Sequence, residues 1–292
     1  MDRQKWIRFG RMITRERNII LQSRHGRPFL ADVYYKKDGE LKPVVVFSHG
    51  FKGFKDWGPF DMVAERFAGA GFVYVKFSFS HNGTTVDHPM DFVDLEAFGN
   101  DNLSIELDDL GVVLDWVFSD DFTAKADADL RSLCLIGHSR GGGISLLKAK
   151  EDARVEKVCT WGSVNEFSKF WSKEELEKIK RDGVVFVGNS RTGQMMPIKW
   201  QLYENYFANL PRLFVPDAVR ALKIPLLIIH GTKDETVPAE YAVEMHSWNE
   251  SSKLLLIENS NHNFGGKHPW TENELPKDLE KVVQETMRFF RT

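Results

Sequence analysis

Short apolar runs recur along this chain and are separated by stretches in which apolar residues return every third or fourth position. Pro43–Phe47 is apolar without interruption, which is typical of a strand buried on both faces. Ile19–Ser23 and Pro28–Tyr35 are rich in β-forming residues, and the short link His25-Gly26-Arg27 between them predicts a hairpin. Further strands are predicted at Phe72–Phe77, Leu133–Ile136, Val155–Trp161, Pro225–Ile229 and Lys253–Ile257.

Helices are predicted between most of these strands. From Leu103 to Val117 a leucine or valine returns at every third or fourth residue, the spacing of an amphipathic helix. Ser78–Asn100 is polar and is predicted to be a loop. The other predicted helices are Phe60–Ala70, Gly143–Lys150, Val237–Trp248 and Leu275–Phe290. Strands that alternate with helices predict an α/β fold, with a mostly parallel sheet covered on both faces and functional groups at the carboxyl ends of the strands.

The alternation breaks at Asn165–Pro216, which is far longer than an ordinary connection of about 2–6 residues. This segment contains a charged helical stretch, Ser172–Arg181, and a β-like run, Val184–Val187. We therefore expect one domain over residues 1–292, with residues 165–216 inserted as a cap or lid. Three of its aromatic residues lie at helical spacing and are tentative pocket residues, although such stripes more often pack a helix onto a core. They are Trp200, Tyr203 and Phe207.

Composition narrows the classes of partner. The formal net charge of −3 over 292 residues does not indicate a nucleic-acid-binding protein. No apolar stretch approaches the roughly 20 residues of a membrane span, and the first residues carry no apolar segment typical of a signal peptide. We expect a cytoplasmic monomer or homodimer. Cys134 and Cys159 each lie in a predicted buried strand and are expected to be reduced core thiols, because neither has the spacing of a metal site.

The candidate chemistry centres on Ser139, in Gly137-His138-Ser139-Arg140-Gly141. The pentapeptide directly follows a predicted buried strand and precedes a predicted helix. Glycines two residues on either side of a serine permit the sharp turn that presents its hydroxyl to a substrate. A serine hydroxyl becomes a nucleophile only when a neighbouring base removes its proton. The motif alone arises easily by chance, so its meaning depends on partners elsewhere in the chain.

A base and an acid follow two later strands. His262 lies in the polar, glycine-rich loop after the last predicted strand, and His268, further along that loop, is the alternative base. Asp234 follows the strand Pro225–Ile229, and its neighbour Glu235 is the alternative acid. The order Ser139, Asp234, His262 matches the chain order of a Ser-Asp-His triad on this kind of fold. We interpret these three residues as the catalytic group.

An oxyanion site needs backbone N–H donors close to the nucleophile. Arg140 supplies one donor because it begins the helix after Ser139. Phe51, in the loop Ser48-His49-Gly50-Phe51, is the predicted second donor because Gly50 lets the chain bend towards the serine. His49 and His138 lie beside tight turns and are interpreted as packing and hydrogen-bonding residues.

Over nearly its whole length, from about residue 19, the chain resembles the α/β-hydrolase superfamily. The Ser48–Phe51 loop, Gly137–Gly141, the Asp234 loop and the inserted segment resemble bacterial carboxylesterases of the cinnamoyl/feruloyl type and their dienelactone-hydrolase-like relatives. The resemblance implies ester hydrolysis without a cofactor or metal, with Ser139, His262 and Asp234 as the triad. The sequence departs from the pattern at Arg140, where many such esterases have Gln or Met. It also has Ser139 where a true dienelactone hydrolase has Cys.

Two other classes of function remain open. A peptidase or amidase could use the same triad on amides, although no propeller-sized N-terminal domain precedes it. A non-catalytic ligand-binding protein of the same fold should lack a triad side chain, and none is missing. The aromatic inserted segment favours esters with aromatic or small to medium acyl groups over charged ones.

Overall fold

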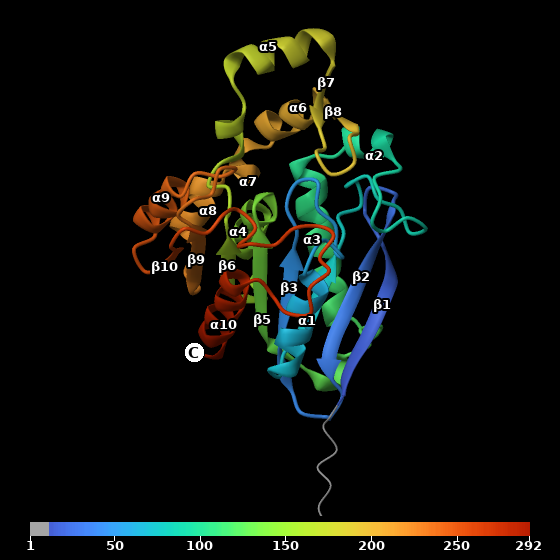
Figure 1. Cartoon of the computed structure of the whole chain (residues 1–292), viewed down its shortest axis with the longest axis vertical. Helices are drawn as coiled ribbons and strands as arrows, with labels where there is room; N and C mark the ends of the chain where they lie inside the picture. Colours follow the sequence, from blue (N-terminus) through green and yellow to red (C-terminus); the bar gives the residue numbers. More distant parts are fainter. Residues whose placement is uncertain (1–11) are drawn as a thin grey trace, which may run out of the picture.

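The computed structural model describes residues 12–292, so the N-terminal stretch behind the cytoplasmic expectation lies outside the described residues. An eight-stranded sheet with the order β1-β2-β4-β3-β5-β6-β9-β10 forms the centre of the molecule (Figure 1). Its strands are β1 (Ile13–Gln22), β2 (Pro28–Lys36), β3 (Lys42–Ser48), β4 (Val73–Phe77), β5 (Ala128–His138), β6 (Val155–Trp161), β9 (Leu226–Gly231) and β10 (Lys253–Ile257). Only the pairs β1–β2 and β2–β4 are antiparallel; the other neighbouring strands are parallel.

Strand register brings the candidate loops to one edge of the sheet. Ser48 at the end of β3 lies opposite Gly137 near the end of β5. His138 in turn lies opposite Trp161 at the end of β6. The loop after β3 and the turn after β5 therefore leave the sheet side by side.

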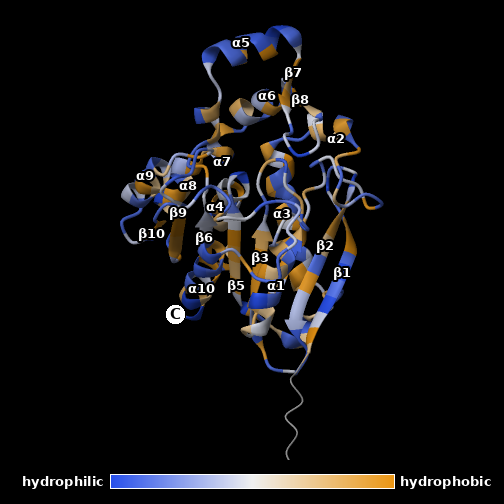
Figure 2. Ribbon diagram, viewed as in Figure 1, coloured by the Kyte–Doolittle hydropathy of each residue, from blue (hydrophilic) through white to orange (hydrophobic). Residues whose placement is uncertain are grey.

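Helices cover both faces of the sheet. Apolar residues of α3, α4, α8 and α9 pack in one core cluster, and those of α1 and α10 pack in another on the opposite face. The inner strands β3, β5 and β9 are predominantly hydrophobic, whereas β1 at the edge of the sheet carries long hydrophilic stretches (Figure 2). The helices of this part of the chain are α1 (Phe60–Gly69), α2 (Leu95–Gly99), α3 (Leu103–Phe118), the 3₁₀ turn η1 (Lys125–Asp127), α4 (Arg140–Glu151), α9 (Glu240–Trp248) and α10 (Lys277–Arg291).

The predicted α/β architecture is confirmed, but three local predictions were wrong. Strand β5 spans Ala128–His138 and is longer than the predicted Leu133–Ile136. The polar stretch predicted as a loop contains α2, where the Asp94 side chain accepts a hydrogen bond from the Ala97 N–H. Helix α4 begins at Arg140, three residues earlier than predicted. Glycine weakens a helix by its own propensity, but here tertiary packing holds the glycines in one.

The segment between β6 and β9 places α5, β7, β8 and α6 beyond the carboxyl edge of the sheet, at the top of Figure 1, and returns through α8, which packs against α4 and α9 on one face of the sheet. Its elements are the 3₁₀ turn η2 (Phe167–Phe170), α5 (Lys173–Asp182), β7 (Val184–Gly188), β8 (Met195–Lys199), α6 (Gln201–Ala208), α7 (Leu210–Leu213) and α8 (Val215–Ala221). β7 and β8 form a separate antiparallel hairpin. Ser172 and Glu175 form a capping box at the start of α5, and Gly183 ends that helix in a left-handed conformation.

Cys134 and Cys159 are both buried and free. Burial raises the pKa of each thiol to about 12, so both are inert thiols at neutral pH. In the described part of the chain, no helix combines the length and apolar character needed to cross a bilayer.

A buried charge network ties the antiparallel end of the sheet to α1. The ammonium groups of Lys55 and Lys76 have no exposure and lie 2.9 and 2.8 Å from the carboxylate of Asp32, which is itself fully buried. Asp56 and Asp61 also pair with these lysines, and the partly exposed Arg17 pairs with all three carboxylates. Burial opposes the charge of Lys76, but Asp32, Asp56 and Asp61 raise its pKa overall. Each charge is therefore stable only because its partners are present.

We predict that Asp32→Asn destabilises the protein by about 3–5 kcal/mol, because it leaves two buried ammonium groups with too little compensating charge. The free energy of unfolding in urea measures the effect. Glu65→Gln is the matched control, since the ion pair between Arg15 and Glu65 is roughly half-exposed and should be worth less than about 1 kcal/mol. Equal losses in the two variants would contradict the prediction.

Candidate functional site

Ser139 occupies the sharp turn between β5 and α4. Its backbone has φ 56° and ψ −122°, a conformation that is strained for any residue with a side chain. The Ser139 N–H donates to the Trp161 carbonyl at 2.9 Å, and the Gly142 N–H donates to the Ser139 carbonyl at 3.0 Å. These hydrogen bonds hold the turn from both sides. The strained conformation is therefore imposed by the neighbouring strand and the first turn of the helix.

Glycines surround Ser139 because other chain segments pass too close for side chains. A Cβ atom on Gly137 would lie 2.2 Å from the Gly141 carbonyl oxygen, and one on Gly141 would lie 2.4 Å from the carbonyl oxygens of Ser48 and His49. A Cβ atom on Gly50 would lie 2.8 Å from the Cβ of Ser139. The loop after β3 therefore passes directly beside the serine.

His262 and Asp234 form a second pair at the same sheet edge. The His262 Nδ1 lies 2.7 Å from the Asp234 Oδ2, and the Asp234 Oδ1 accepts the backbone N–H groups of Thr236 and Val237. The His230 Nε2 lies 3.1 Å from the same Oδ2. Burial opposes the charge of Asp234, but the hydrogen bonds from His230 and His262 hold the pKa of this carboxyl well below its usual value. Asp234 is thus a permanent anion that fixes Nδ1 as the protonated nitrogen of His262.

Ser139 and His262 line one cavity without being hydrogen-bonded to each other. Among the hydrogen bonds of residues 12–292, none joins the Ser139 Oγ to the His262 Nε2. Such bonds are commonly long in the absence of substrate and tighten when it binds. Gly162, at φ 54°, packs directly against the Asp234–His262 pair. A Cβ at this position would lie 3.3 Å from both the Asp234 Oδ2 and the His262 Nδ1, so a side chain would crowd the pair.

His138 and His49 hold the backbone of the site. The His138 Nε2 lies 3.0 Å from the carbonyl oxygen of His262. The His49 Nδ1 lies 2.9 Å from the Gly50 carbonyl oxygen, and its Nε2 accepts the Phe79 N–H. Burial and the neighbouring His262 lower the pKa of His138 to about 3, and burial lowers that of His49 to about 4. Both rings are neutral hydrogen-bonding groups at neutral pH.

Two backbone N–H groups beside Ser139 remain available. Arg140 is the first residue of α4, so its N–H has no partner within the helix. No hydrogen bond within the described residues uses the N–H of Arg140 or of Phe51. Both residues line the same cavity as Ser139. Both N–H groups therefore lack a partner within the described residues and belong to residues that line the cavity at Ser139.

The Arg140 side chain packs on the Phe51 ring and so links the two residues whose backbone N–H groups are unused. Its guanidinium lies 4.2 Å from the centre of the Phe51 ring and pairs with Glu106 at 3.1 Å and Asp101 at 3.5 Å. Burial and the nearby Glu106 raise the pKa of Asp101 well above its usual value. Arg140 is therefore held between an aromatic ring and two buried acidic groups, which fixes it against the loop that carries Phe51.

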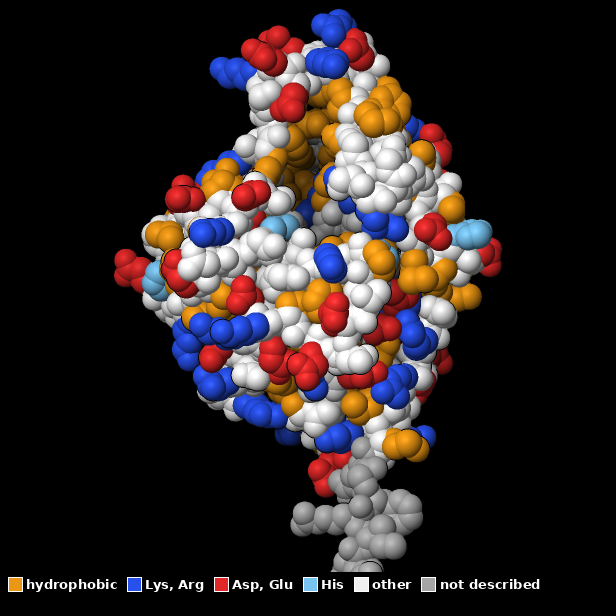
Figure 3. Space-filling model, in the orientation of Figure 1, with side chains coloured by type: hydrophobic (Ala, Val, Ile, Leu, Met, Phe, Trp, Pro, Cys, Tyr) orange, Lys and Arg blue, Asp and Glu red, His pale blue; other side chains and the backbone are white. Residues whose placement is uncertain are grey.

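An apolar cavity of about 450 Å³ extends from Ser139 beneath the β6–β9 segment, and Figure 3 shows its hydrophobic walls below the charged surface of α5. Tyr203 lines it, as predicted for the pocket. Trp200 and Phe207 do not line it: Trp200 stacks on Tyr203, and Phe207 is 48% exposed. The aromatic residues that line it in addition to Tyr203 are Phe51, Phe167, Phe170, Trp171 and Phe186.

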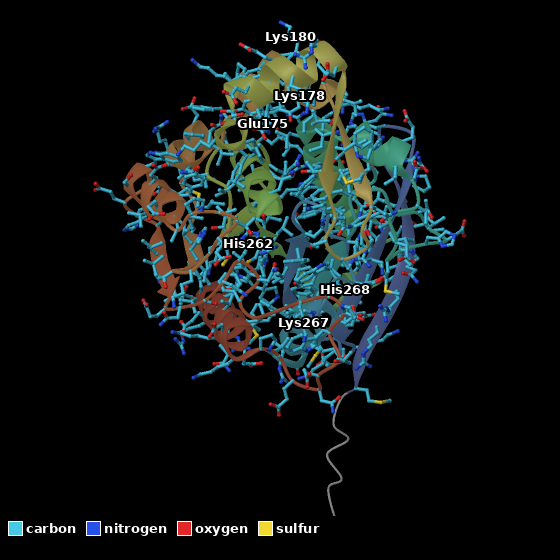
Figure 4. The ribbon with its side chains drawn as sticks, turned by 45° about the horizontal axis from the view of Figure 1, so that its top comes forward. Glu175, Lys178, Lys180, His262, Lys267 and His268 are labelled. Atoms are coloured by element: carbon cyan, nitrogen blue, oxygen red, sulfur yellow. The ribbon has the colours of Figure 1, made fainter. Side chains whose placement is uncertain are left out.

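A second, more polar cavity of about 730 Å³ opens on the other side of Ser139. The sequence analysis did not predict it. Its lining residues come from the loop after β3, the β7–β8 turn and the loop between β10 and α10. Figure 4 shows His262, Lys267 and His268 on this last loop, with Glu175 and Lys178 on α5 above them. The two cavities share Phe51, Ser139 and Thr236.

The alternative base, His268, and the alternative acid, Glu235, are not part of the His262–Asp234 pair. The His268 Nδ1 accepts the Gly58 N–H at 2.8 Å, and its ring packs against Phe54 and Trp57. No hydrogen bond of the described residues joins Glu235 to His262. His230 was missed by the sequence analysis as a partner of Asp234, although it lies four residues before that acid, at the end of a strand.

One group of carboxylates in the described residues is spaced to hold a cation: Asp32, Asp56 and Asp61. The ammonium groups of Lys55 and Lys76 already lie among these carboxylates. The group is therefore part of the buried charge network, and its carboxylates already have ammonium partners.

Comparison with solved structures places the chain among α/β-hydrolases at the level of fold. Est1E from Butyrivibrio proteoclasticus is similar over 94% of this chain and 97% of its own, with 20% identity and a TM-score of 0.65. A putative hydrolase from Agrobacterium vitis covers 96% and 99%, with 18% identity and a TM-score of 0.69. The esterase domain of a Rhodothermus marinus protein covers 96% and 98%, with 18% identity and a TM-score of 0.63.

No protein-family model and no curated protein matches the sequence. The resemblance inferred from the Ser139 motif is thus confirmed for the α/β-hydrolase fold. At 18–20% identity, the likeness shows the fold alone, so the activity has to be inferred from the residues of the site.

We predict that stability falls as pH drops from about 6.5 towards 4. The unfolded chain binds protons on His49 and His138 near the ordinary histidine pKa, whereas the folded protein keeps both rings neutral. For each of the two rings, the free energy of unfolding should fall by about 2 kcal/mol between pH 7 and pH 4.5. Urea unfolding at both pH values measures the loss, and His138→Gln should make it smaller. An unchanged pH dependence in that variant would contradict the assignment.

We also predict that Arg140→Gln lowers kcat by roughly tenfold to a hundredfold by loosening the Phe51 loop, which is less than the roughly 10²- to 10³-fold loss when an oxyanion donor is removed outright. The substitution also leaves Glu106 unpaired, so the double variant Arg140→Gln/Glu106→Gln is the control. We expect the double variant to recover stability in urea while kcat on a small ester stays low. Recovery of both would show that the unpaired carboxylate, rather than the position of Phe51, caused the loss.

Proposed function

We propose that this chain is a serine hydrolase that cleaves carboxylic esters through an acyl-enzyme, with Ser139, His262 and Asp234 as its triad. One observation carries the proposal: a strained serine turn lies beside two unused N–H donors and faces the same cavity as an aspartate-bound imidazole. These are the parts that acyl transfer requires, namely a presented nucleophile, an oriented base and a site for the oxyanion.

In the proposed first step, His262 removes the Ser139 proton while the Oγ attacks the ester carbonyl. The negative charge on the carbonyl oxygen is then held by the N–H groups of Phe51 and Arg140. Asp234 stabilises the imidazolium that forms, because it is a buried anion bonded to the His262 Nδ1. The imidazolium gives its proton to the leaving alcohol, and a water activated by the same ring releases the acid.

We further propose that residues 165–216 act as a cap that shapes the acyl pocket. The apolar cavity beneath this segment is large enough for an aromatic or medium-length acyl group and is walled mainly by aromatic and aliphatic side chains. A ferulic acid complex of Est1E is among the structures similar to this chain. That likeness supports an aromatic acyl group without specifying one.

We predict that Ser139→Ala lowers kcat/KM on p-nitrophenyl butyrate by a factor on the order of 10⁴ or more and abolishes labelling by a fluorophosphonate. His262→Ala should cause a comparable loss in turnover. His246→Ala is the matched control, because that ring bonds to Ser252 away from both cavities. Ordinary turnover by folded Ser139→Ala would overturn the nucleophile assignment.

Comparing p-nitrophenyl butyrate with the corresponding amide, butyryl p-nitroanilide, separates esterase from amidase activity. We expect the ester to be the better substrate by a wide margin after correction for intrinsic reactivity. A higher kcat/KM for the anilide would favour a peptidase or amidase with the same triad.

A further inference from the structure

The two cavities that meet at Ser139 differ in charge. The larger one is lined by Lys52, Arg191 and Lys267, and no Asp or Glu is among its lining residues. The apolar cavity contains one acidic residue, Glu175, together with Lys178 and the Arg140 that is already paired. The three cations come from three separate loops, and the fold gathers them in the cavity whose lining has no acidic residue to offset them.

The position of His262 decides which part of an ester enters each cavity. His262 lines the basic cavity and is absent from the lining of the apolar one. In acyl transfer the imidazole that activates the serine also protonates the leaving alcohol, so the alcohol must lie on the imidazole side. The acyl group must then lie on the other side of Ser139, in the apolar cavity.

The three cations have no carboxylate partner within ion-pair distance among the described residues. The Lys52 Nζ donates to the Gly188 carbonyl at 3.2 Å, and Arg191 reaches only the Met90 carbonyl at 3.4 Å and the faces of Phe54 and Phe92. Lys267 is exposed at the mouth of the cavity. What distinguishes this cavity is that three cations without a carboxylate partner gather in a lining that contains no acidic residue.

Two uncharged donors accompany these cations. Asn189, which also lines the cavity, is only 7% exposed, and its Nδ2 has no hydrogen-bond partner. Its Oδ1 accepts the Arg191 N–H, so the unused group is the amide donor. His268 uses its Nδ1 as the acceptor for Gly58, which leaves its Nε2 as the protonated nitrogen. A buried donor without an acceptor is costly unless a ligand supplies one.

We propose that the preferred substrate is an ester whose leaving alcohol carries an anionic group, a carboxylate or a phosphate, held by Lys52, Arg191 and Lys267. The inference rests on the proposed esterase function and adds the charge of the alcohol to it. Asn189 and His268 supply neutral donors to the same anionic group. The apolar acyl group lies opposite, beneath the β6–β9 segment.

A matched series of butyryl esters tests the proposal on the full chain. The esters are those of 3-hydroxybenzoate, 3-hydroxyphenyl phosphate, the neutral isostere 3-hydroxybenzamide and the cationic (3-hydroxyphenyl)trimethylammonium. Each kcat/KM is divided by the rate of hydroxide-catalysed hydrolysis of the same ester. We expect at least one anionic ester to exceed the amide by about tenfold or more and the cationic ester to be the poorest. The better of the two anions identifies the anionic group.

Variants locate the effect. Arg191→Gln and Lys267→Gln should each lower the ratio of anionic to neutral kcat/KM by roughly twofold to tenfold, mainly through KM, and added salt should lower it in the parent protein. Lys223→Gln is the matched control, because this substitution removes the same net charge, while Lys223 itself is exposed and lines neither cavity. An equal change in Lys223→Gln would mean that net charge acts at long range, which would overturn the proposed site.

A second series reverses the charge. The monosuccinyl ester of 3-hydroxybenzamide carries its carboxylate on the acyl side and should be a poor substrate. If it exceeds the butyryl ester of 3-hydroxybenzoate, the cations hold the acyl group and the assignment of the cavities is wrong. Turnover of the neutral ester with no preference for anions overturns this inference alone. No turnover of any ester overturns the esterase proposal, and this inference with it.

Discussion

The site depends on backbone segments that approach each other too closely for side chains. Around Ser139, Gly137 meets the first turn of α4, Gly141 meets the end of β3, and Gly50 lies against the serine itself. This packing compels Ser139 to keep a positive φ at the carboxyl edge of the sheet. The same contact brings the loop that carries Phe51 against Ser139, so the proposed nucleophile and the proposed oxyanion donor depend on one arrangement. A methyl group at any of these glycines would move several elements at once.

The titratable residues around this turn differ in charge and in hydrogen bonding, and these differences give them different roles. Burial keeps His138 and His49 neutral, so they act as hydrogen-bonding supports for the loops. Asp234 stays charged because four donors converge on it: two imidazoles and two backbone N–H groups. Only His262, among these imidazoles, is both bound to that anion and a lining residue of the cavity at Ser139 with 13% of its side chain exposed. Imidazoles of one chemical type thus receive different roles from burial and hydrogen bonding alone.

Prediction from sequence worked where the information was local. The uninterrupted apolar strands and the periodic helix after Leu103 predicted the layers, and the chain order of Ser139, Asp234 and His262 predicted residues that meet at one sheet edge. It failed where tertiary contacts override local preference. The helix after Ser139 was predicted to begin at Gly143, yet α4 begins at Arg140, where Gly142 and Gly143 pack against Ser163 and Phe167. The helical spacing of Trp200 and Phe207 could not reveal that Tyr203 alone of the three faces the cavity.

By itself, the sequence determined the α/β architecture, the serine turn and the candidate acid and base, because each depends on residue type and short-range pattern. Only the tertiary structure decided how these groups are surrounded. It paired His230 with Asp234, held Arg140 against Phe51, and gathered Lys52, Arg191 and Lys267 from distant loops around one cavity. The physical reason is that electrostatic environment and cavity shape arise from side chains far apart in the sequence, whose meeting is set by strand register and loop path.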